Sequence, residues 1–419
     1  MKKIFIKTFG CTLNQKDSED IIGNISSFSD EKKITDADLI IVNTCGVKEQ
    51  TEEKILKYLR EIKQKGIKEE KIIITGCLVT INDTGLKEIL PNAKYFKVEE
   101  KEKLKKLLNS KEKEQKKNTE IIIISNGCLG ACSYCAVKFA RGTLKSKSIS
   151  EIKKEVEKAI ENNTKEILLT SQDTGCYGFD INTNIVELLK EIIKIPGDFK
   201  IRLGMANPKY LLKYKEEISK ILNSKKMYKF LHIPIQSGND EILKKMNRPY
   251  TVKECEELIT YFKKEHKELT LSTDIIVGFP TETEEQFKDT LNIIKKLKFD
   301  IVNISRFGQR KNIEANKYPD LPGRIKKERS RKTTILCKKI ALENNLKYLN
   351  KIKTVRVVGF NNKDTICRTK EYKQVILVNK KEKIGKTLDL LITDVKEHYL
   401  LGSKIEKQNL KRTDLLKKE

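Results

Sequence analysis

The strongest constraint on the fold is a repeated alternation of short apolar runs and helical patterns between residues 120 and 345. Amphipathic segments such as Ile149–Glu161 and Thr283–Lys298 separate six apolar runs that have the length of buried strands. Strands joined through helices pair in parallel, because the helix returns the chain to the same end of the sheet. The pattern therefore predicts an α/β fold with a central partial (β/α)6 barrel over residues 120–345. The predicted strands are Ile121–Ser125, Ile167–Ser171, Phe199–Leu203, Phe230–Ile235, Thr270–Val277 and Ile301–Arg306, and Thr333–Leu349 is predicted as a closing helix.

Residues 1–110 repeat this alternation on a smaller scale. Apolar runs at Ile4–Lys7, Leu39–Asn43 and Ile72–Thr75 are predicted strands, and Thr51–Gln64 has the pattern of a helix between two of them. We expect an N-terminal domain with a parallel sheet covered by helices. Residues 99–119 form a charged helix or linker that ends in Lys111–Thr119, a stretch that is almost entirely polar.

The pattern changes after residue 350, where short strand-like runs follow one another without a helix of useful length. Such a run of strands over residues 350–407 predicts a small all-β barrel of the kind that binds oligonucleotides. Residues 346–419 carry 19 Lys and Arg against 9 Asp and Glu, which suits an RNA-binding appendage, although a solvated tail explains part of the excess. The predicted strands are Thr354–Gly359, Gln374–Val378, Thr387–Thr393 and His398–Leu401.

Charge and cysteine content narrow the function classes. A formal charge of +27 favours a polyanionic partner such as nucleic acid, but solvated charged faces explain it equally well. Ten cysteines accompany only three histidines, which argues against zinc hydrolases, whose sites usually include histidine. No apolar stretch approaches the roughly 20 residues of a membrane helix. We therefore expect a cytoplasmic protein with no membrane partner, in which cysteines are metal ligands or buried thiols and not disulfides.

The sharpest local signal is a compact cysteine motif formed by Cys128, Cys132 and Cys135. Iron–sulfur clusters usually take four cysteines, so three thiolates in eight residues leave one iron open for a substrate. The motif follows the first predicted barrel strand and therefore lies at the C-terminal mouth, where barrel enzymes keep their active sites. A zinc knuckle with a distant fourth ligand is the alternative, but the location favours an iron–sulfur cluster.

A second trio, Cys11, Cys45 and Cys77, lies in the first domain. Each cysteine comes at the end of an apolar strand of one predicted parallel sheet, and ligands collect beyond the carboxyl ends of such strands. Glycines at 10, 46 and 76 flank the cysteines and suit tight turns. Any one of these cysteines alone would be interpreted as a buried thiol. Their equivalent positions favour a second metal site.

Several motifs resemble those of the radical S-adenosylmethionine (SAM) methylthiotransferases, and the resemblance covers nearly the whole chain. It implies an N-terminal domain with an auxiliary [4Fe-4S] cluster at Cys11, Cys45 and Cys77, a radical SAM barrel with a second [4Fe-4S] cluster at Cys128, Cys132 and Cys135, and an RNA-binding TRAM domain. The motifs are Thr8–Gln15, Val42–Gly46, Thr75–Leu78, the Cys128–Cys135 segment, Leu231–Gly238 and Asp274–Pro280.

Two further segments, Ser171–Gly178 and Arg202–Pro208, look most like the archaeal and eukaryotic branch of this family. That branch adds a methylthio group to C2 of N6-threonylcarbamoyladenosine at position 37 of tRNA. The resemblance implies that one SAM methylates a sulfur at the auxiliary cluster and a second SAM yields the radical that attacks the C2–H bond. It also implies an external electron donor and a sulfur donor, which the sequence does not name.

The same resemblance implies SAM-binding positions at the ends of the barrel strands, and we assign no catalytic residue beyond the clusters. A role in packing or capping is an equal alternative for each of these residues. Relatives place an aromatic residue near SAM within the cluster loop, the SAM amino group beside the second strand, and the adenine against the fifth. The predicted cofactor-binding residues are Tyr134, Ser171, Gln172, Asp173, Arg202, Gln236, Ser237, Ile276 and Gly278.

One loop departs from the family pattern. Relatives commonly carry an Arg-Pro-Gly-Thr turn after the sixth strand, whereas this chain has Gln309–Ala315, in which only Arg310 matches. Two alternatives keep the chemistry and change the target, to isopentenyladenosine in tRNA or to a ribosomal protein. A third, from another class, is a non-catalytic RNA-binding protein with structural metal sites.

Overall fold

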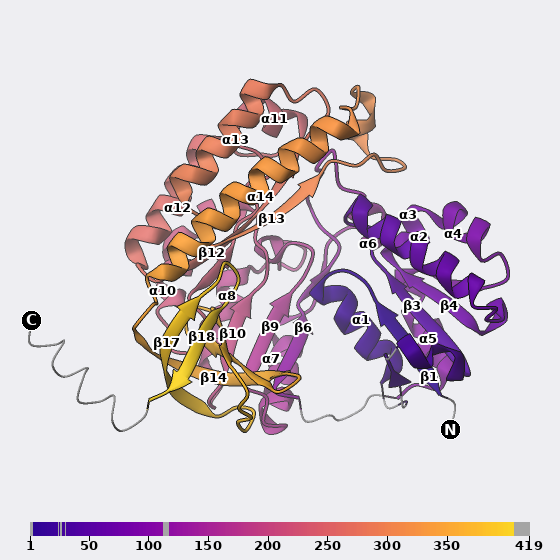
Figure 1. The fold of residues 1–419 in the computed structure, drawn as a ribbon, viewed down its shortest axis with the longest axis horizontal. Coiled ribbons are helices and arrows are strands. Elements are labelled where there is room, and N and C mark those ends of the chain that lie inside the picture. Colours follow the sequence, from indigo (N-terminus) through magenta and orange to yellow (C-terminus); the bar gives the residue numbers. More distant parts are fainter. Residues whose placement is uncertain (1–2, 24, 26, 30, 112–116, 406–419) are drawn as a thin grey trace, which may run out of the picture.

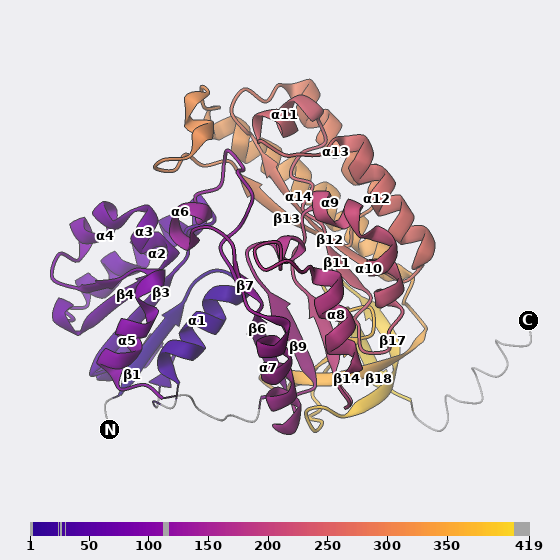
Figure 2. The same cartoon turned by 180° about the vertical axis from the view of Figure 1, so that it is seen from behind.

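The computed structural model describes residues 3–405 except positions 24, 26, 30 and 112–116. Figures 1 and 2 show three parts in chain order: an α/β domain with an open parallel sheet, a central half-open β/α barrel, and a small β-barrel beneath it. This architecture confirms the predicted fold class. Predicted residues 406 and 407 of the last domain lie outside the described range. Within the described ranges, no helix has both the length and the apolar composition needed to cross a membrane.

The first domain is built on a parallel five-stranded sheet in the order β2-β1-β3-β4-β5. Its central strands β3 and β4 are almost entirely buried, as expected for a parallel sheet covered on both faces. The strands are β1 (Ile4–Thr8), β2 (Ser27–Phe28), β3 (Leu39–Thr44), β4 (Ile72–Gly76) and β5 (Lys94–Phe96), and the helices are α1 (Thr12–Ile22), α2 (Glu49–Gln64), α3 (Cys77–Ile81), α4 (Asp83–Ile89) and α5 (Lys101–Leu108). The helix predicted at Thr51–Gln64 is α2, and α5 occupies the charged segment.

The central barrel consists of two three-stranded parallel sheets, β10-β9-β6 and β11-β12-β13, whose inner edges approach one another. All six strands predicted from the sequence are present, within a few residues of their expected ends. The strands are β6 (Thr119–Ile123), β9 (Glu166–Thr170), β10 (Lys200–Leu203), β11 (Phe230–His232), β12 (Thr270–Val277) and β13 (Ile301–Arg306). A short antiparallel pair, β7 (Ser125–Asn126) with β8 (Lys145–Ser146), closes the base of the loop after β6.

Helices cover the outer face of the barrel and leave its inner face open (Figure 2). The last one, α14 (Gly323–Leu346), begins ten residues before the predicted start and runs across the barrel. Its polar N-terminal half gives little periodic signal, because Lys326 and Arg329 are buried in ion pairs with acidic partners. The other helices are α6 (Val137–Arg141), α7 (Ile149–Glu161), α8 (Ile185–Lys194), α9 (Pro208–Lys213), α10 (Lys215–Leu222), α11 (Asp240–Lys245), α12 (Val252–Glu265) and α13 (Glu284–Leu297).

The third domain is a closed barrel in the strand order β14-β15-β16-β18-β17. The sequence analysis missed β15, whose polar, alternating residues pair with both neighbours. Buried ion pairs hold this domain against the amino ends of the central strands: Arg368 with Glu166 at 3.3 Å and Lys373 with Asp300 at 2.7 Å. Its strands are β14 (Ile352–Asn361), β15 (Asp364–Thr369), β16 (Gln374–Leu377), β17 (Thr387–Val395) and β18 (Leu400–Lys404).

Candidate functional site

The three cysteines of the first domain meet at the carboxyl edge of its sheet. Strands β1, β3 and β4 are neighbours in parallel register, so their carboxyl ends lie side by side. Cys11 precedes α1, Cys45 directly follows β3, and Cys77 begins α3 directly after β4. The topology thus brings together three residues that are more than 30 positions apart in the sequence.

These thiols are close enough to affect one another. A Cβ atom at Gly10, whose φ is +104°, would lie 2.6 Å from Cys45 Sγ, so only glycine leaves room there. Burial raises the pKa of Cys45 to about 12 and also raises the pKa of Cys77, and nearby thiolate charge adds to both shifts. Burial disfavours the negative charge of a free thiolate, and a bound metal ion compensates that charge. Metal binding therefore stabilises such a site. The trio therefore fits a thiolate-bound metal centre.

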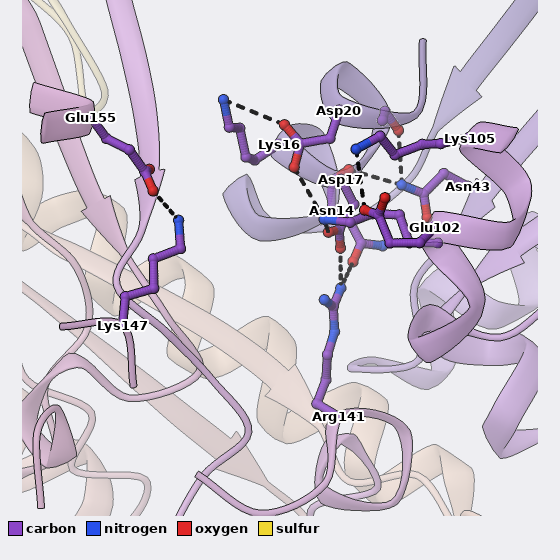
Figure 3. A network of polar contacts seen from close by, with 12 residues as sticks. Asn14, Lys16, Asp17, Asp20, Asn43, Glu102, Lys105, Arg141, Lys147 and Glu155 are labelled. Atoms are coloured by element: carbon purple, nitrogen blue, oxygen red, sulfur yellow. Dashed lines mark hydrogen bonds and ion pairs between the residues drawn. The ribbon is translucent and has the colours of Figure 1, made fainter. Parts of the chain in front are cut away.

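An arginine from the barrel completes this first site (Figure 3). Arg141, the last residue of α6, donates from Nε to Cys77 Sγ at 3.3 Å and from Nη2 to Asn14 Oδ1 at 2.8 Å. It also pairs with Asp17 at 2.7 Å. Burial disfavours its charge, but Cys77 and Asp17 outweigh this and raise the pKa of Arg141 further. The sequence analysis did not identify this residue.

The second trio lies in the loop between β7 and α6. The backbone N–H of Gly130 donates to Cys128 Sγ at 3.2 Å, and the N–H of Cys135 donates to the carbonyl of Cys132 at 3.1 Å. A Cβ at Gly130 would lie 3.3 Å from Cys128 Sγ and 3.7 Å from Cys132 Sγ, which places those sulfurs around one hollow of the loop. Burial raises the pKa of Cys135 to about 11. Three thiols with a backbone donor between them suit an iron–sulfur cluster.

A second arginine, partly buried, contacts this trio. Arg248 donates to Cys132 Sγ at 3.1 Å, to the carbonyl of Pro234 at 3.2 Å and to the hydroxyl of Tyr250 at 2.5 Å. Each trio is therefore held by one guanidinium that reaches it from elsewhere in the chain. In the sequence this arginine follows α11 without a motif that indicates its role, so its contact with the cysteine loop was not predicted. Cys176, also buried, donates from Sγ to the carbonyl of Asp173 at 3.2 Å. Its thiol lies near Cys128 and lowers the pKa of Cys128.

Polar groups at the end of β9 face the same mouth. The Ser171 hydroxyl and both polar atoms of the Gln172 amide are buried without a hydrogen-bond partner among the described residues. The carboxylate of Asp173 accepts from the N–H groups of Gly175 and Asn207 at 2.9 and 3.1 Å, and burial raises its pKa to about 6. Buried groups without partners are what a polar ligand would satisfy.

The other predicted cofactor residues occupy more varied positions. Gln236, which has a φ of +69°, is buried and pairs with β12 in an isolated parallel bridge a few residues after β11. The hydroxyl of Ser237 contacts Thr290 in α13, so it faces a helix. Ile276 and Tyr134 pack against a hydrophobic cluster to which both the first domain and the barrel contribute, and burial raises the pKa of Tyr134.

Gly278 and Arg202 have surroundings that the sequence did not predict. A Cβ at Gly278 would lie 2.4 Å from the Lys326 side chain, and its N–H donates to Glu282 at 2.8 Å. The guanidinium of Arg202 lies 5.1 Å from the ring of Phe230 and 5.8 Å from that of Tyr372 in the third domain. Arg202 thus points towards the base of the barrel, and its role in cofactor binding stays a prediction.

The atypical loop Gln309–Ala315 connects the parts of the site. Arg310 pairs with Glu52 of α2 at 2.5 Å, and the N–H of Ala315 donates to the carbonyl of Ser133 in the cysteine loop at 2.8 Å. Side chains of this loop pack into the core of the first domain. The loop therefore joins that domain to the barrel despite its unusual sequence.

Comparison with known proteins assigns a family to each part of the chain. Residues 3–97 match the uncharacterized protein family UPF0004, residues 122–294 the radical SAM superfamily, and residues 346–405 the TRAM domain. The chain is 38% identical over 96% of its length to the probable threonylcarbamoyladenosine tRNA methylthiotransferase of Archaeoglobus fulgidus, 98% of which is covered. This chain belongs to the threonylcarbamoyladenosine tRNA methylthiotransferase family.

The relationship extends to eukaryotes. The human threonylcarbamoyladenosine tRNA methylthiotransferase is 31% identical over 97% of this chain, which covers 74% of the human protein. Among solved structures, the radical SAM methyltransferase TsrM of Kitasatospora setae matches with a TM-score of 0.56 at 13% identity, over 75% of each chain. That similarity concerns the fold. The family assignment confirms the resemblance stated from the sequence motifs.

Proposed function

We propose that this chain is a tRNA methylthiotransferase that adds a methylthio group to C2 of N6-threonylcarbamoyladenosine at position 37, with SAM and two [4Fe-4S] clusters. Relatives with that activity in their names match it over nearly its full length. The observation that carries the proposal is the pair of thiol trios joined by Arg141, because methylthiolation needs a sulfur-bearing site beside a radical-generating one.

The cysteine ligands of each metal site come from a single domain. Cys128, Cys132 and Cys135 would hold the cluster that binds SAM. Cys11, Cys45 and Cys77 would hold the auxiliary cluster. When bound, the first cluster with SAM would supply a radical that activates the C2–H bond, and the second would hold the sulfur that is transferred.

The remaining residues of the mouth bind and orient. Ionised Asp173 would attract the ammonium group of SAM, while the partnerless polar atoms of Ser171 and Gln172 offer it hydrogen bonds.

The third domain would bind tRNA electrostatically through its excess of Lys and Arg, and its affinity for tRNA would fall strongly as the salt concentration rises. An external electron donor and a sulfur donor complete the proposed set of partners. Because the six ligand thiols must stay reduced until they bind iron, we expect the reaction to take place in the cytoplasm.

Mass spectrometry of tRNA nucleosides tests this function directly. A host that makes N6-threonylcarbamoyladenosine but lacks its methylthio derivative would express the wild type and the Cys45→Ala and Cys132→Ala variants. We expect the methylthio derivative only with the wild type. Of the two variants, Cys45→Ala should still cleave SAM and Cys132→Ala should not. A methylthio group on isopentenyladenosine, or on a ribosomal protein, would instead assign the substrate of one of the two related branches.

A further inference from the structure

Arg141 links the two thiol trios through a path that the family assignment does not describe. The residue ends α6, which begins two residues after Cys135, yet its guanidinium lies in the first domain. Its side chain is 2% exposed, so the charge is fully enclosed by protein. A buried guanidinium is costly unless each of its donors meets an acceptor, and here the acceptors include a ligand thiol.

The partners of Arg141 are themselves fixed. Asp17, which accepts from Nη2, is held by Lys101 at 3.2 Å. Asn14 is completely buried and donates from Nδ2 to the carbonyls of Phe9 at 3.0 Å and Thr44 at 2.8 Å. The amide of Asn14 is thereby oriented with Oδ1 towards the guanidinium, as Figure 3 shows. The rotamer of Arg141 is therefore determined by the first domain.

This arrangement reaches all three segments that carry the auxiliary ligands. Phe9 lies two residues before Cys11, and Thr44 directly precedes Cys45. Asn14 holds both carbonyls, and Arg141 holds both Asn14 and Cys77 Sγ. A single arginine from the SAM-cluster loop thus helps to set the relative positions of three cysteines in another domain.

We propose that Arg141 is a positioning residue that fixes the ligand geometry of the auxiliary cluster and, through its donation to Cys77 Sγ, makes that cluster easier to reduce. The inference rests on the proposed two-cluster function. A hydrogen bond and a positive charge at a ligand sulfur both stabilise the more negative, reduced cluster. A change in the order of the SAM-cluster loop would then alter the ligand geometry of the auxiliary cluster, because α6 follows that loop and carries Arg141.

The alternative role of Arg141 is to dock the first domain against the barrel. Another ion pair at the same interface provides a matched control. Lys16 of α1 pairs with Glu120 of β6 at 2.6 Å across the same boundary, and among the described residues neither forms a hydrogen bond or an ion pair with a thiol. Loss of either ion pair would weaken docking. Of these two changes, the loss of Arg141 would also remove a donor from a ligand sulfur, that of Cys77.

The experiment uses the full chain with Cys128, Cys132 and Cys135 all replaced by alanine, so that only the auxiliary cluster gives a signal. Into this parent we would introduce Arg141→Met, Arg141→Lys and, as the control, Lys16→Met. Each protein is reconstituted anaerobically, analysed for iron, and titrated with reductant while the electron paramagnetic resonance (EPR) signal is recorded. No tRNA is needed, so the substrate assignment does not affect the result.

We expect the Arg141→Met cluster to have a more negative reduction potential and an altered EPR spectrum, while the Lys16→Met cluster matches the parent. Lysine keeps the charge but lacks the guanidinium fork, so Arg141→Lys should lie between them. Identical potentials and spectra for Arg141→Met and Lys16→Met would overturn the inference.

If the Arg141→Met protein binds no iron, its cluster cannot be titrated. The reduction potential and EPR spectrum of Arg141→Lys are then compared with those of Lys16→Met, and the same criterion applies. A parent protein that binds no iron would instead refute the two-cluster proposal itself, and this inference with it.

Discussion

Replacement of Gly10 by alanine should destroy one metal site and spare the other. The backbone at Gly10 has φ of +104°, and alanine there costs about 1–2 kcal/mol in strain. The added Cβ would also lie 2.5 Å from Cys45 Cβ and 2.6 Å from Cys45 Sγ. Relief of such overpacking typically costs a further 1–3 kcal/mol or so. The sum, roughly 2–5 kcal/mol, would be relieved most directly by displacement of the Cys45 side chain.

Gly66, just after α2, provides the matched control. Its φ is +70°, but a Cβ there would meet nothing within 4 Å. Gly66→Ala therefore carries the strain of about 1–2 kcal/mol without the clash. Comparison of the two variants separates the geometry of the site from the general cost of a strained residue.

The assay is iron and sulfide content after anaerobic reconstitution, with urea unfolding for stability. We expect Gly10→Ala to lose about half of the bound iron and all sulfur insertion but to keep SAM cleavage, and Gly66→Ala to keep all three. Full iron content and wild-type sulfur insertion in Gly10→Ala would refute the placement of Cys45 as a ligand beside Gly10.

Three further changes have defined outcomes. Burial raises the folded-state pKa of Asp173 from its ordinary value of 3.8 to about 6, so the wild type should lose up to about 3 kcal/mol of stability as pH rises from 4 to 6. Urea unfolding of Asp173→Asn should lack this fall, and a pH profile identical to that of the wild type would contradict the assignment. Arg248→Met removes a charged donor from Cys132 Sγ and should destabilise the protein by about 2–3 kcal/mol and alter the EPR spectrum of the SAM-binding cluster. Lys373→Met breaks a buried pair with Asp300 and should cost about 3–5 kcal/mol and weaken tRNA binding in gel-shift assays, with SAM cleavage in the absence of tRNA kept.

The inner strands of the first domain and the six strands of the barrel were predictable because their sequences are continuous apolar runs, as buried parallel strands require. The short edge strands β2 and β5 of the first sheet and the β7–β8 pair have no such run and were not predicted. Prediction was weaker where burial is partial. Strand β15 was missed, since Asp364–Thr369 includes charged and hydroxyl side chains that become ordered only by pairing with β14 and β16. The first turns of α14 were missed because buried charges there find partners from distant elements.

For the site, the position of each cysteine at a strand end was visible in the sequence, and parallel topology then brings the cysteines together. The arginines were not visible, because Arg141 and Arg248 act through contacts across more than 60 residues of sequence. Arg202 shows the reverse case. Its strand was predicted, but the sequence could not show that the third domain would place the ring of Tyr372 beneath it.

The central claim is that each thiol trio holds its own [4Fe-4S] cluster. Iron and sulfide analysis of anaerobically reconstituted protein tests it most directly, on the wild type and on the variant with Cys128, Cys132 and Cys135 replaced by alanine. The account predicts about eight irons per wild-type chain and about four in the variant. About four irons in the wild type and none in the variant would contradict it, because the first domain would then carry no cluster.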